Sequence, residues 1–463
     1  MRQPAPWAIR SQHLWAVLIH RLLVSDILPG RSDARLCADA VPSWAVGARS
    51  VVRPLSWHVA PIGGDGTYTY GWSPATGLSD PKAANPVFTA SAAGSLTFIL
   101  TVTDGQETTA SDGVVITVVE AASARIVDVD SGLWHNVLSL DDGTIRTWGY
   151  NNHGQLGDGS LGDDIVSADA GSLSTLVAKA DGTAWVFGFS AFGQLGAAPV
   201  HVPGISDVVQ VGTLTAGGIL LKGDGTVWGF IQSHGNCELA GGAAYGDAVL
   251  EPVQIPGLAD VTTIATGEHH AVALDSTGTA WVWGWVFGCT PWAVLDNVTA
   301  VAAGTSGHCL FLLDDGTVLA MGFNLMAQLG NGTRTSNYNT ATQVIGMTNV
   351  VDIAAGDRHS MFLKSDGTLW TCGWARNGRL GLSDDVLAAA GNDLLYGKYL
   401  TVPKQVGLAD VAAIGGGQTH SVAVQGDGTV WAWGYNTYEQ LSGGTSTSLP
   451  DAVATPVQID FGE

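Results

Sequence analysis

The chain has few charged residues, and most of those are acidic. Only 13% of its 463 residues are charged, with 19 Lys and Arg against 41 Asp and Glu, which gives a formal net charge of -22 at pH 7. Such a chain repels phosphate backbones and anionic lipid headgroups. We therefore expect no nucleic-acid partner; a protein partner with a cationic surface suits the chain better.

Long apolar runs are also absent. No stretch of the sequence reaches the roughly 18 apolar residues that a membrane-spanning helix needs, so we expect no integral membrane segment. Near the N-terminus a short apolar run, Leu14–Ile19, follows the basic residues Arg2 and Arg10, and Ala38-Asp39-Ala40 is a possible cleavage site. Residues 1–44 are predicted to be a leader, either a signal peptide or a disordered segment.

The chain lacks the paired cysteines of a zinc or redox site. Its five cysteines, Cys37, Cys237, Cys289, Cys309 and Cys372, contain no Cys-x-x-Cys pair. An odd number leaves at least one thiol unpaired in a monomer. We expect small buried thiols; a bridge between Cys237 and Cys289 is the alternative.

Glycine and tryptophan, in contrast, are abundant. The 62 glycines and 17 tryptophans indicate many tight turns around buried aromatic side chains, which is typical of all-β proteins. One motif recurs seven times: Asp-Gly-Thr, replaced by Ser-Thr-Gly-Thr in the fourth copy, then alternating apolar residues, then Trp-Gly or a near variant. The glycines of this motif are Gly143, Gly182, Gly225, Gly278, Gly316, Gly367 and Gly428.

Each copy predicts a β-hairpin, with Asp-Gly in a type I′ turn. Shorter strands on either side bring the unit to about four strands, which is the size of one β-propeller blade. Insertions follow Trp-Gly in most copies, so we expect the long loops on one face. The first copy has no lead-in strand, so the C-terminal strand, residues 455–461, is predicted to complete the first blade and close the ring.

The sequence from Trp148 to Gly157 resembles the signature of the regulator-of-chromosome-condensation repeat family. Variants of its Gly-Gln-Leu-Gly element recur at Gly193, Ala327, Gly378 and Glu439. The resemblance implies a seven-bladed propeller over residues 121–463. Members of the family include a nucleotide-exchange factor, a plant ultraviolet photoreceptor and secreted bacterial β-lactamase inhibitors, so fold does not fix function.

Residues 45–120 resemble a polycystic-kidney-disease (PKD) Ig-like domain. The resemblance rests on Tyr68–Asp80, Asn85-Pro86, Thr101–Gly105 and Val114–Val118. It implies a small β-sandwich with Trp72 in its core. Because such domains in bacteria are extracellular spacers or adhesion modules, the resemblance favours an extracellular or cell-surface location.

Histidine recurs in phase with the blades, which argues against catalysis. His135, His270, His308, His359 and His420 each lie eight residues before the turn glycine, whereas a catalytic histidine is needed only once. We expect them to be structural, with ring nitrogens bonded to backbone. The sequence has no phosphate-binding loop and no nucleophile elbow. We therefore expect no catalytic residue, no metal and no cofactor, and hence no enzyme.

An aromatic residue follows the Trp-Gly element in every copy. These residues are Tyr150, Phe189, Phe230, Trp285, Phe323, Trp374 and Tyr435. They are predicted to form a ring on one face of the propeller, either as packing between blades or as a binding surface, because aromatic side chains concentrate where interfaces bind most strongly.

Three functions fit these observations. The leading hypothesis is a monomeric, non-catalytic, secreted or surface protein whose propeller binds a protein partner through the aromatic ring. The first alternative is a guanine-nucleotide exchange factor or regulator of a small GTPase. The second is a carbohydrate-binding or carbohydrate-active extracellular protein, for which the sequence offers no specific pair of catalytic carboxylates.

Overall fold

The fold is described from a computed structural model, which divides the chain into two units, Arg10–Ser123 and Ala124–Glu463. The description covers residues 14–19, 55–56, 67–84, 86–88, 94–107, 109–121, 124–190, 193–215, 217–231, 249–442 and 449–461. None of the helices in these ranges is long and apolar enough to cross a membrane.

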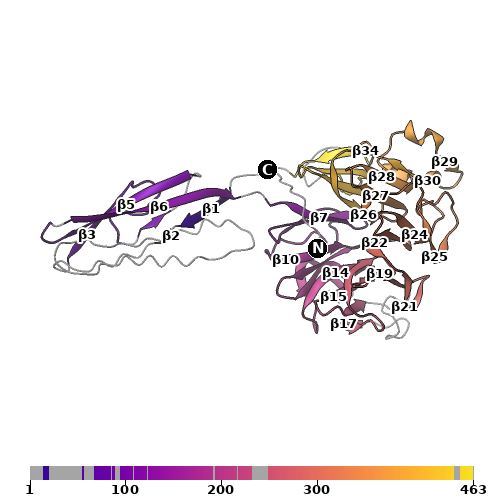
Figure 1. Ribbon diagram of the computed structural model, residues 1–463, viewed down its shortest axis with the longest axis horizontal. Helices are drawn as coiled ribbons and strands as arrows, with labels where there is room; N and C mark the ends of the chain where they lie inside the picture. The colour runs from indigo at the N-terminus through magenta and orange to yellow at the C-terminus, as the bar shows by residue number, and fades with distance from the viewer. Residues whose placement is uncertain are drawn as a thin grey trace. The chain divides into compact units, whose positions relative to one another are not determined.

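The N-terminal unit contains two antiparallel sheets (Figure 1). The larger has the strand order β1-β6-β5-β3 and the smaller pairs β2 with β4. The strands are β1 (Leu14–Ile19), β2 (Leu55–Ser56), β3 (Tyr68–Ser73), β4 (Val87–Phe88), β5 (Gly94–Asp104) and β6 (Thr109–Ala121). The apolar run interpreted as part of a leader is thus strand β1, with Val17 opposite Val118; the other residues of 1–44 lie outside the description.

Trp72 is buried in this unit, as the sequence predicts. Its indole nitrogen donates to the Ala83 carbonyl at 3.1 Å, and Phe88, Phe98 and Leu100 are also buried. Phe88 and Phe98 pack edge to face with ring centroids 5.1 Å apart. Whether these strands make an Ig-like sandwich of the PKD type stays a prediction.

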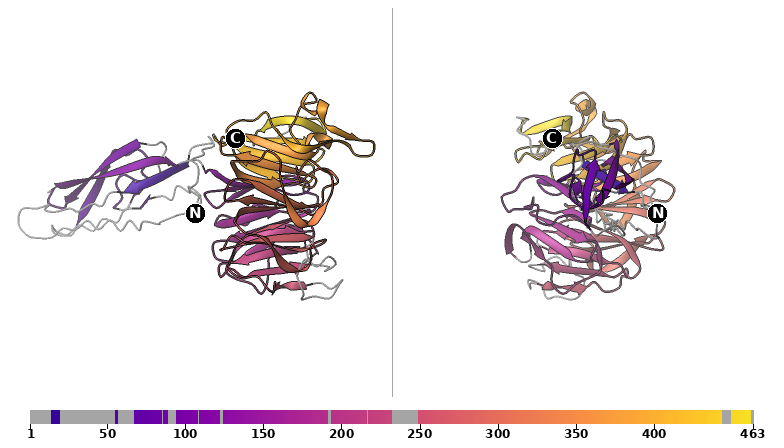
Figure 2. Two further views of the ribbon diagram at one scale, coloured as in Figure 1. Left: turned by 45° about the vertical axis from the view of Figure 1, so that its right-hand side comes forward. Right: turned by 90° about the vertical axis from the view of Figure 1, so that its left-hand side faces the viewer.

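The second unit is a seven-bladed β-propeller whose sheets follow one another around a ring (Figures 1 and 2). The first strands contact each other around the ring, including β31 with β7. These strands are β7 (Ile126–Ser131), β10 (Ile165–Ala170), β14 (Val208–Leu214), β18 (Val261–Thr266), β22 (Val298–Gly304), β26 (Val350–Ala355) and β31 (Val411–Gly416).

The second and third strands of each blade form the hairpin that the repeat predicts. The second strands are β8 (His135–Leu140), β11 (Ser174–Lys179), β15 (Gly217–Lys222), β19 (His270–Asp275), β23 (His308–Leu313), β27 (His359–Lys364) and β32 (His420–Gln425). The third strands are β9 (Ile145–Gly149), β12 (Ala184–Ser190), β16 (Val227–Ile231), β20 (Ala280–Gly284), β24 (Val318–Gly322), β28 (Leu369–Trp374) and β33 (Val430–Tyr435).

A fourth strand lies outermost in six blades. These strands are β13 (Gly193–His201), β17 (Val249–Gln254), β21 (Gly288–Leu295), β25 (Asn337–Gln343), β30 (Gly397–Gln405) and β34 (Ala452–Ile459). Blade 6 is larger, with an extra strand, β29 (Gly391–Asp393), and two short 3₁₀ helices, η1 (Arg376–Gly378) and η2 (Val386–Ala389). The described part of blade 1 contains only three strands.

The predicted closure by the C-terminal strand is wrong. Strand β34 pairs with β33 of its own blade, with Val457 opposite Ala432, and not with the first blade. The ring closes instead by packing: Ile126, Val129 and Leu138 of blade 1 share one core with side chains of blade 7 such as Val422 and Val424.

The turn type is also different from the prediction. In the first copy only Gly143 has a positive φ, of 76°, whereas a type I′ turn needs two such residues. The Gly143 amide donates to the Leu140 carbonyl at 3.1 Å and the Leu140 amide donates to the Thr144 carbonyl at 2.9 Å. This is the pattern of a type I turn with a glycine bulge. The Asp142 carboxylate accepts from the Thr144 amide and hydroxyl at 3.0 and 2.6 Å, which explains why Asp-Gly-Thr recurs.

The recurring histidines connect neighbouring blades. Four of them share a hydrogen bond with a side chain on the second strand of the next blade. That side chain directly follows the first residue of the strand, which is the position that holds histidine in five of the blades. The pairs are His135 with Thr175 (3.0 Å), His308 with Ser360 (3.1 Å), His359 with Ser421 (2.8 Å) and His420 with Asn136 (2.7 Å). The second member of each pair then donates to the backbone carbonyl of Gln155, Gln328, Arg379 or Gln440, respectively. The histidines are therefore structural: their Nε2 atoms bond to side chains, and those side chains bond to backbone.

The connection between blades 4 and 5 lacks this hydrogen bond. The corresponding residue of blade 5 is Cys309, and neither ring nitrogen of His270 has a hydrogen-bond partner within the described ranges. The His270 ring packs against Phe287 instead, with centroids 5.3 Å apart. Phe287 stands in the segment of blade 4 that replaces Gly-Gln-Leu-Gly, so the carbonyl that accepts the connector in other blades is absent there, and an apolar thiol suits the position.

Replacing Asn136 should loosen the closure of the ring. Asn136 accepts from Ser131 and pairs with His420, both at 2.7 Å, and donates to the Gln440 carbonyl at 3.1 Å. We expect Asn136→Leu to lower the free energy of unfolding by about 2 to 3 kcal/mol, because it leaves buried partners unsatisfied. Cys309→Ala, at the same position in blade 5, removes no hydrogen bond and should cost less. Equal losses in urea denaturation would contradict the connector role.

Candidate protein-binding face

Six of the seven predicted ring residues lie at the same end of their blades. The backbone amide of each donates to the carbonyl of the residue just before its second strand, at 2.7 to 2.9 Å. The pairs are Tyr150 with Trp134, Phe189 with Leu173, Trp285 with His269, Phe323 with Gly307, Trp374 with Arg358 and Tyr435 with Thr419. We call this end of the propeller the aromatic face. It also carries the connections between third and fourth strands, where the insertions fall.

Phe230 is not part of this ring. It is fully buried and packs in the core between blades 2 and 3. The backbone register explains the difference: Ile231, and not Gly229, pairs with Gly217 in the way that Gly284 pairs with His270. Phe230 therefore occupies the position of Trp283, which is also fully buried. The prediction of a binding role for Phe230 is wrong because it has no exposed surface.

The other six residues differ in exposure. Trp285 exposes 45% of its surface, whereas Trp374 exposes 8% and donates from its indole to the Tyr396 carbonyl at 2.5 Å. Tyr150, Phe189, Phe323 and Tyr435 are half-buried. Trp374 therefore supports local structure, while the remaining five could contact a partner.

Several of these side chains join a larger cluster across blades 7, 1 and 2. Tyr150 contacts Trp134 and Tyr438, with ring centroids 5.2 and 4.8 Å apart, and Tyr438 also contacts Tyr435 at 6.1 Å. His153 lies between Tyr150 and Phe189, at 6.1 and 6.0 Å. We call these six residues, Trp134, Tyr150, His153, Phe189, Tyr435 and Tyr438, the aromatic patch. All are half-buried.

The sequence did not reveal three members of the patch. Trp134, His153 and Tyr438 do not recur in phase: the equivalents of Trp134, for instance, include Leu173 and Thr419. A search for repetition cannot find a residue that occurs in one copy only. The available signal was that loops of blades 1 and 7 contain aromatic residues. These residues can form one cluster because the closed ring places blade 7 next to blade 1.

Carboxylates gather near the axis of the ring. Glu268 of blade 4 accepts from the Ser172 hydroxyl of blade 2 at 3.2 Å, so both reach inward across blade 3, and burial raises the pKa of Glu268. On the first strands, Asp130 accepts from the Ala170 amide at 2.6 Å and Asp169 from the Thr213 amide at 2.7 Å. Burial also raises the pKa of both Asp130 and Asp169, with the neighbouring Asp169 charge adding to the effect on Asp130.

These carboxylates do not form a metal site. Within the described ranges no group of three or more His, Cys, Asp or Glu side chains is placed to hold a metal ion. The hydrogen bonds that Asp130 and Asp169 accept from backbone amides of the next blade connect the first strands to each other. We therefore assign them a structural role.

Two cysteines of the propeller are buried free thiols, Cys309 and Cys372, as expected from the sequence. Cys289 is disulfide-bonded. Its partner lies outside the described ranges, as do both Cys37 and Cys237, so the Cys237–Cys289 bridge stays a prediction.

Comparison with known families matches the repeat directly. Two sequence models, both described as the regulator of chromosome condensation (RCC1) repeat, match residues 126–155, 350–379 and 411–440 and residues 315–363 and 366–424. The propeller contains RCC1 repeats. The matches fall on blades 1, 5, 6 and 7, which are also the blades with a complete histidine connector to the next blade.

Curated relatives of the RCC1 propeller have varied names. The chain is 31% identical over 268 residues to the human E3 ubiquitin-protein ligase HERC2, which covers 54% of this chain and 5% of that protein. It is 27% identical over 349 residues to protein pim1 of Schizosaccharomyces pombe, which covers 67% of this chain and 59% of that protein. It is 27% identical over 201 residues to the guanine nucleotide exchange factor SRM1 of Saccharomyces cerevisiae, which covers 38% of this chain and 41% of that protein. The chain therefore spans less than two thirds of each of these relatives.

Solved structures confirm the fold. Yeast RCC1 (Prp20), in a complex with Kap60, superposes with a TM-score of 0.59 at 20% identity, over 73% of this chain and 84% of that chain. Human WBSCR16 superposes with a TM-score of 0.54 at 20% identity, over 68% of this chain and 94% of that chain. At these identities the likeness shows the propeller fold and not a particular activity.

Proposed function

We propose that the RCC1 propeller works by binding a protein on its aromatic face, and that this partner is a small GTPase whose nucleotide release the propeller accelerates. The observation that carries the binding step is the aromatic patch, in which half-buried rings from three blades come together on the face that bears the insertions. Aromatic side chains in such clusters dominate the energetics of protein interfaces.

The GTPase is favoured by the comparisons. SRM1 is named a guanine nucleotide exchange factor, and a structural study of the same fold in yeast Prp20 concerns its binding to Gsp1p and histones. Exchange needs no nucleophile or metal from the propeller. It needs only a face that binds the GTPase more tightly when its nucleotide has left, because a ligand shifts an equilibrium by its differential affinity for the two states.

The second candidate is a secreted or surface-attached propeller that binds an extracellular protein. A different observation favours it. Cys289 is disulfide-bonded, and structural disulfides persist mainly in oxidising compartments. The PKD-like residues 45–120 point in the same direction. Recovery of the mature protein outside the cell would favour this candidate over exchange on a cytosolic GTPase.

Release of a fluorescent GDP from a panel of purified small GTPases tests the exchange proposal. We expect the full chain at micromolar concentration to accelerate release from at least one GTPase by tenfold or more, since conformational coupling of about 1.4 kcal/mol corresponds to a factor of ten. Release at the intrinsic rate from every member of the panel would contradict it.

A further inference from the structure

Blade 6 carries an insertion that the other described blades lack. Its third and fourth strands are separated by η1, η2 and β29, and β29 and β30 form a hairpin with its tip at Leu394–Tyr396. Because it follows the third strand, this insertion lies on the aromatic face. We call β29, the tip and β30 the blade-6 hairpin.

The tip of the blade-6 hairpin is apolar and exposed. Leu394 and Leu395 expose 105% and 84% of their surfaces, and Tyr396 exposes 39%. Exposing two adjacent leucine side chains to water is energetically unfavourable when no partner is bound. Contiguous exposed apolar surface of this kind marks sites of interaction.

The tip is nevertheless held in a defined shape. The Asp393 carboxylate accepts from the Leu395 and Tyr396 amides at 2.9 and 3.2 Å, and from Arg334 at 2.9 Å. Arg334 and the backbone amides lower the pKa of Asp393. The Trp374 indole fixes the Tyr396 carbonyl from the other side. A preorganised tip loses little conformational entropy when it binds.

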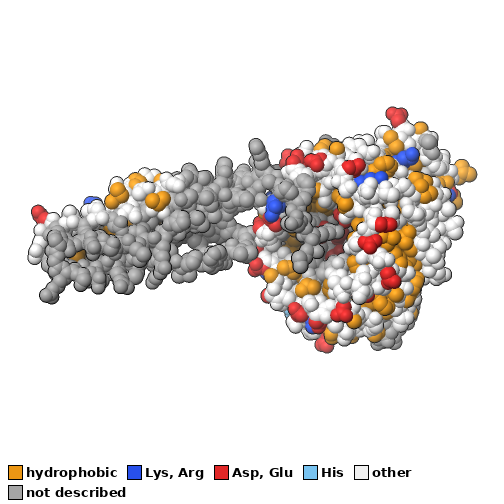
Figure 3. Space-filling model, in the orientation of Figure 1, with side chains coloured by type: hydrophobic (Ala, Val, Ile, Leu, Met, Phe, Trp, Pro, Cys, Tyr) orange, Lys and Arg blue, Asp and Glu red, His pale blue; other side chains and the backbone are white. Residues whose placement is uncertain are grey.

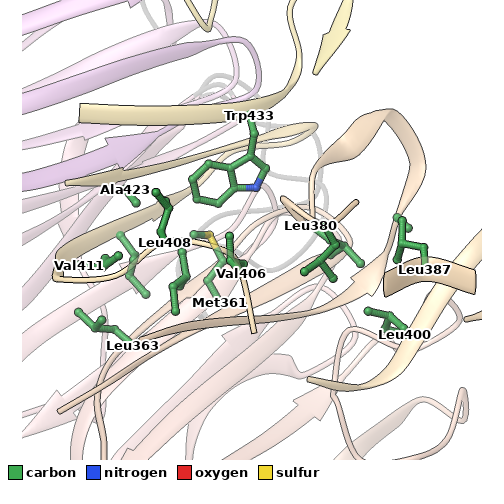
Figure 4. Close-up of a cluster of buried hydrophobic side chains, with 14 residues drawn as sticks. Met361, Leu363, Leu380, Leu387, Leu400, Val406, Leu408, Val411, Ala423 and Trp433 are labelled. Atoms are coloured by element: carbon green, nitrogen blue, oxygen red, sulfur yellow. The ribbon is translucent and has the colours of Figure 1, made fainter. Parts of the chain in front are cut away.

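The base of the insertion is continuous with the core of the propeller. Leu387 of η2 and Leu400 of β30 are both buried and belong to the cluster that includes Trp433 between blades 6 and 7. Figure 4 shows these two leucines facing each other at the end of the cluster away from Trp433. The hairpin is thus a rigid projection with an apolar tip.

A cavity lies beside the tip. Its volume is about 500 Å³, and its lining includes the apolar side chains of Leu387, Leu395 and Tyr396 together with the cationic side chains of Arg376 and Lys398. The volume is in the range that accommodates a few side chains of a peptide. Ala454 of β34 also lines it, so the cavity lies between the blade-6 insertion and the outermost strand of blade 7.

This region is the least acidic part of the propeller. Between residues 334 and 404 there are seven cations, Arg334, Arg358, Lys364, Arg376, Arg379, Lys398 and Lys404, against six carboxylates, Asp352, Asp357, Asp366, Asp384, Asp385 and Asp393. The rest of the chain has 19 − 7 = 12 cations and 41 − 6 = 35 carboxylates. On the visible face of the propeller in Figure 3, blue Lys and Arg atoms gather near the upper edge, where Figure 1 labels β28 and β30.

Arg376 is the cation best placed to meet an anion. It is exposed, its guanidinium lies 5.5 Å from the Trp374 ring centre, and it makes no ion pair with any described residue. Lys398, the other cation of the cavity, has only an exposed partner, Asp384, at 3.3 Å, and such a pair contributes little. An incoming carboxylate could therefore bind both.

We infer that the cavity beside the blade-6 hairpin binds an acidic peptide segment of a partner protein, with carboxylates at Arg376 and Lys398 and an apolar side chain against Leu387, Leu395 and Tyr396. The inference deepens the proposed protein-binding function by naming the chemistry of the partner. It does not depend on the partner being a GTPase. It differs from the expectation of a cationic partner that the net charge of the whole chain gives, because the charge near this cavity differs from that of the whole chain.

A displayed library of random peptides, selected on the immobilised full chain, tests the inference. We expect the enriched peptides to be acidic and to contain paired apolar residues. Their affinity for soluble protein should fall by tenfold or more in Arg376→Glu, because charge reversal replaces attraction by repulsion, and similarly in Leu395→Asp. Both side chains are exposed, so the melting temperatures of these variants should stay close to that of the parent.

Two variants on the opposite face are matched controls. Lys222→Glu reverses a charge and Ile345→Asp replaces an apolar side chain that is 45% exposed, and neither should change peptide affinity. Absence of enrichment, enrichment of basic or uncharged peptides, or equal binding by the cavity and control variants would each overturn the inference. Failure of GDP release alone would leave peptide binding intact, so the two proposals fail separately.

Discussion

Acidification from pH 7 to about pH 4.5 should unfold the propeller. Burial lowers the pKa of His135, His308 and His420 to about 3 and that of His270 to about 4, and it lowers the pKa of His359 well below its ordinary value. In the unfolded chain all five titrate near 6.5. The unfolded state therefore binds more protons below pH 6.5, and stability falls as the pH falls through that value.

The size of the effect follows from the shifts. At pH 4.5, two units below 6.5, each neutral buried histidine disfavours the folded state by about 2.7 kcal/mol, because one pKa unit is worth about 1.36 kcal/mol. Five histidines give on the order of 10 kcal/mol, which is similar to the total stability of a typical domain. Asp130, Asp169 and Glu268 have raised pKa values and offset part of this loss, since they take up protons more readily when folded.

Urea denaturation at a series of pH values measures the prediction. Between pH 6 and 5 the slope of unfolding free energy against pH should correspond to the uptake of about four to five protons. In His308→Gln, which removes one buried histidine, the slope should correspond to the uptake of about one proton fewer. An unfolding free energy that is the same at pH 7 and pH 5 would show that the buried histidines do not remain neutral as described.

Trp433→Ala should be strongly destabilising, whereas Trp285→Ala should not. Trp433 is fully buried between blades 6 and 7, packs with Leu380 and Leu408, and donates from its indole to the Arg379 carbonyl at 2.9 Å. Its removal leaves a large cavity and takes away one of the two hydrogen bonds that the Arg379 carbonyl accepts, so we expect a loss of about 3 to 5 kcal/mol. Trp285 exposes 45% of its surface and should cost less than about 1 kcal/mol.

The two variants form a matched pair because they remove the same side chain from different environments. Urea denaturation followed by circular dichroism avoids the change in tryptophan content. Comparable losses of stability would mean that Trp285 is also a packing residue, and the aromatic face would then lose its most exposed ring. Trp374→Ala, in contrast to Trp285→Ala, should lower stability, because Trp374 is buried and supports the blade-6 hairpin.

The number of blades could be predicted from the sequence because each turn glycine marks one hairpin. The sequence was not sufficient for the boundary of a blade: in a cyclic repeat, the segment at Glu251 can be the first strand of one blade or the last strand of the blade before. The structure assigns it to β17, the last strand of blade 3, and by the same rule Val457 belongs to blade 7. The predicted closure failed for this reason.

The site was less predictable than the fold. Repetition identified Tyr150 and Trp285, but it also included Phe230, because Trp228-Gly229 imitates the Trp-Gly element two residues too early. It could not identify Trp134, Tyr438 or the blade-6 hairpin, since each occurs once. Features that bind one particular partner break the symmetry of the ring, and a periodic signal reports only what the blades have in common.

The most direct test of the account compares two double variants in the GDP-release assay. Tyr150→Ser with Trp285→Ser alters the aromatic face, and Lys222→Glu with Ile345→Asp alters the opposite face. We expect the first to reduce the acceleration of release by tenfold or more, and the second to leave it within about twofold of the parent. Normal acceleration by the aromatic-face variant, or its loss in the opposite-face variant, would contradict the assignment of the binding face.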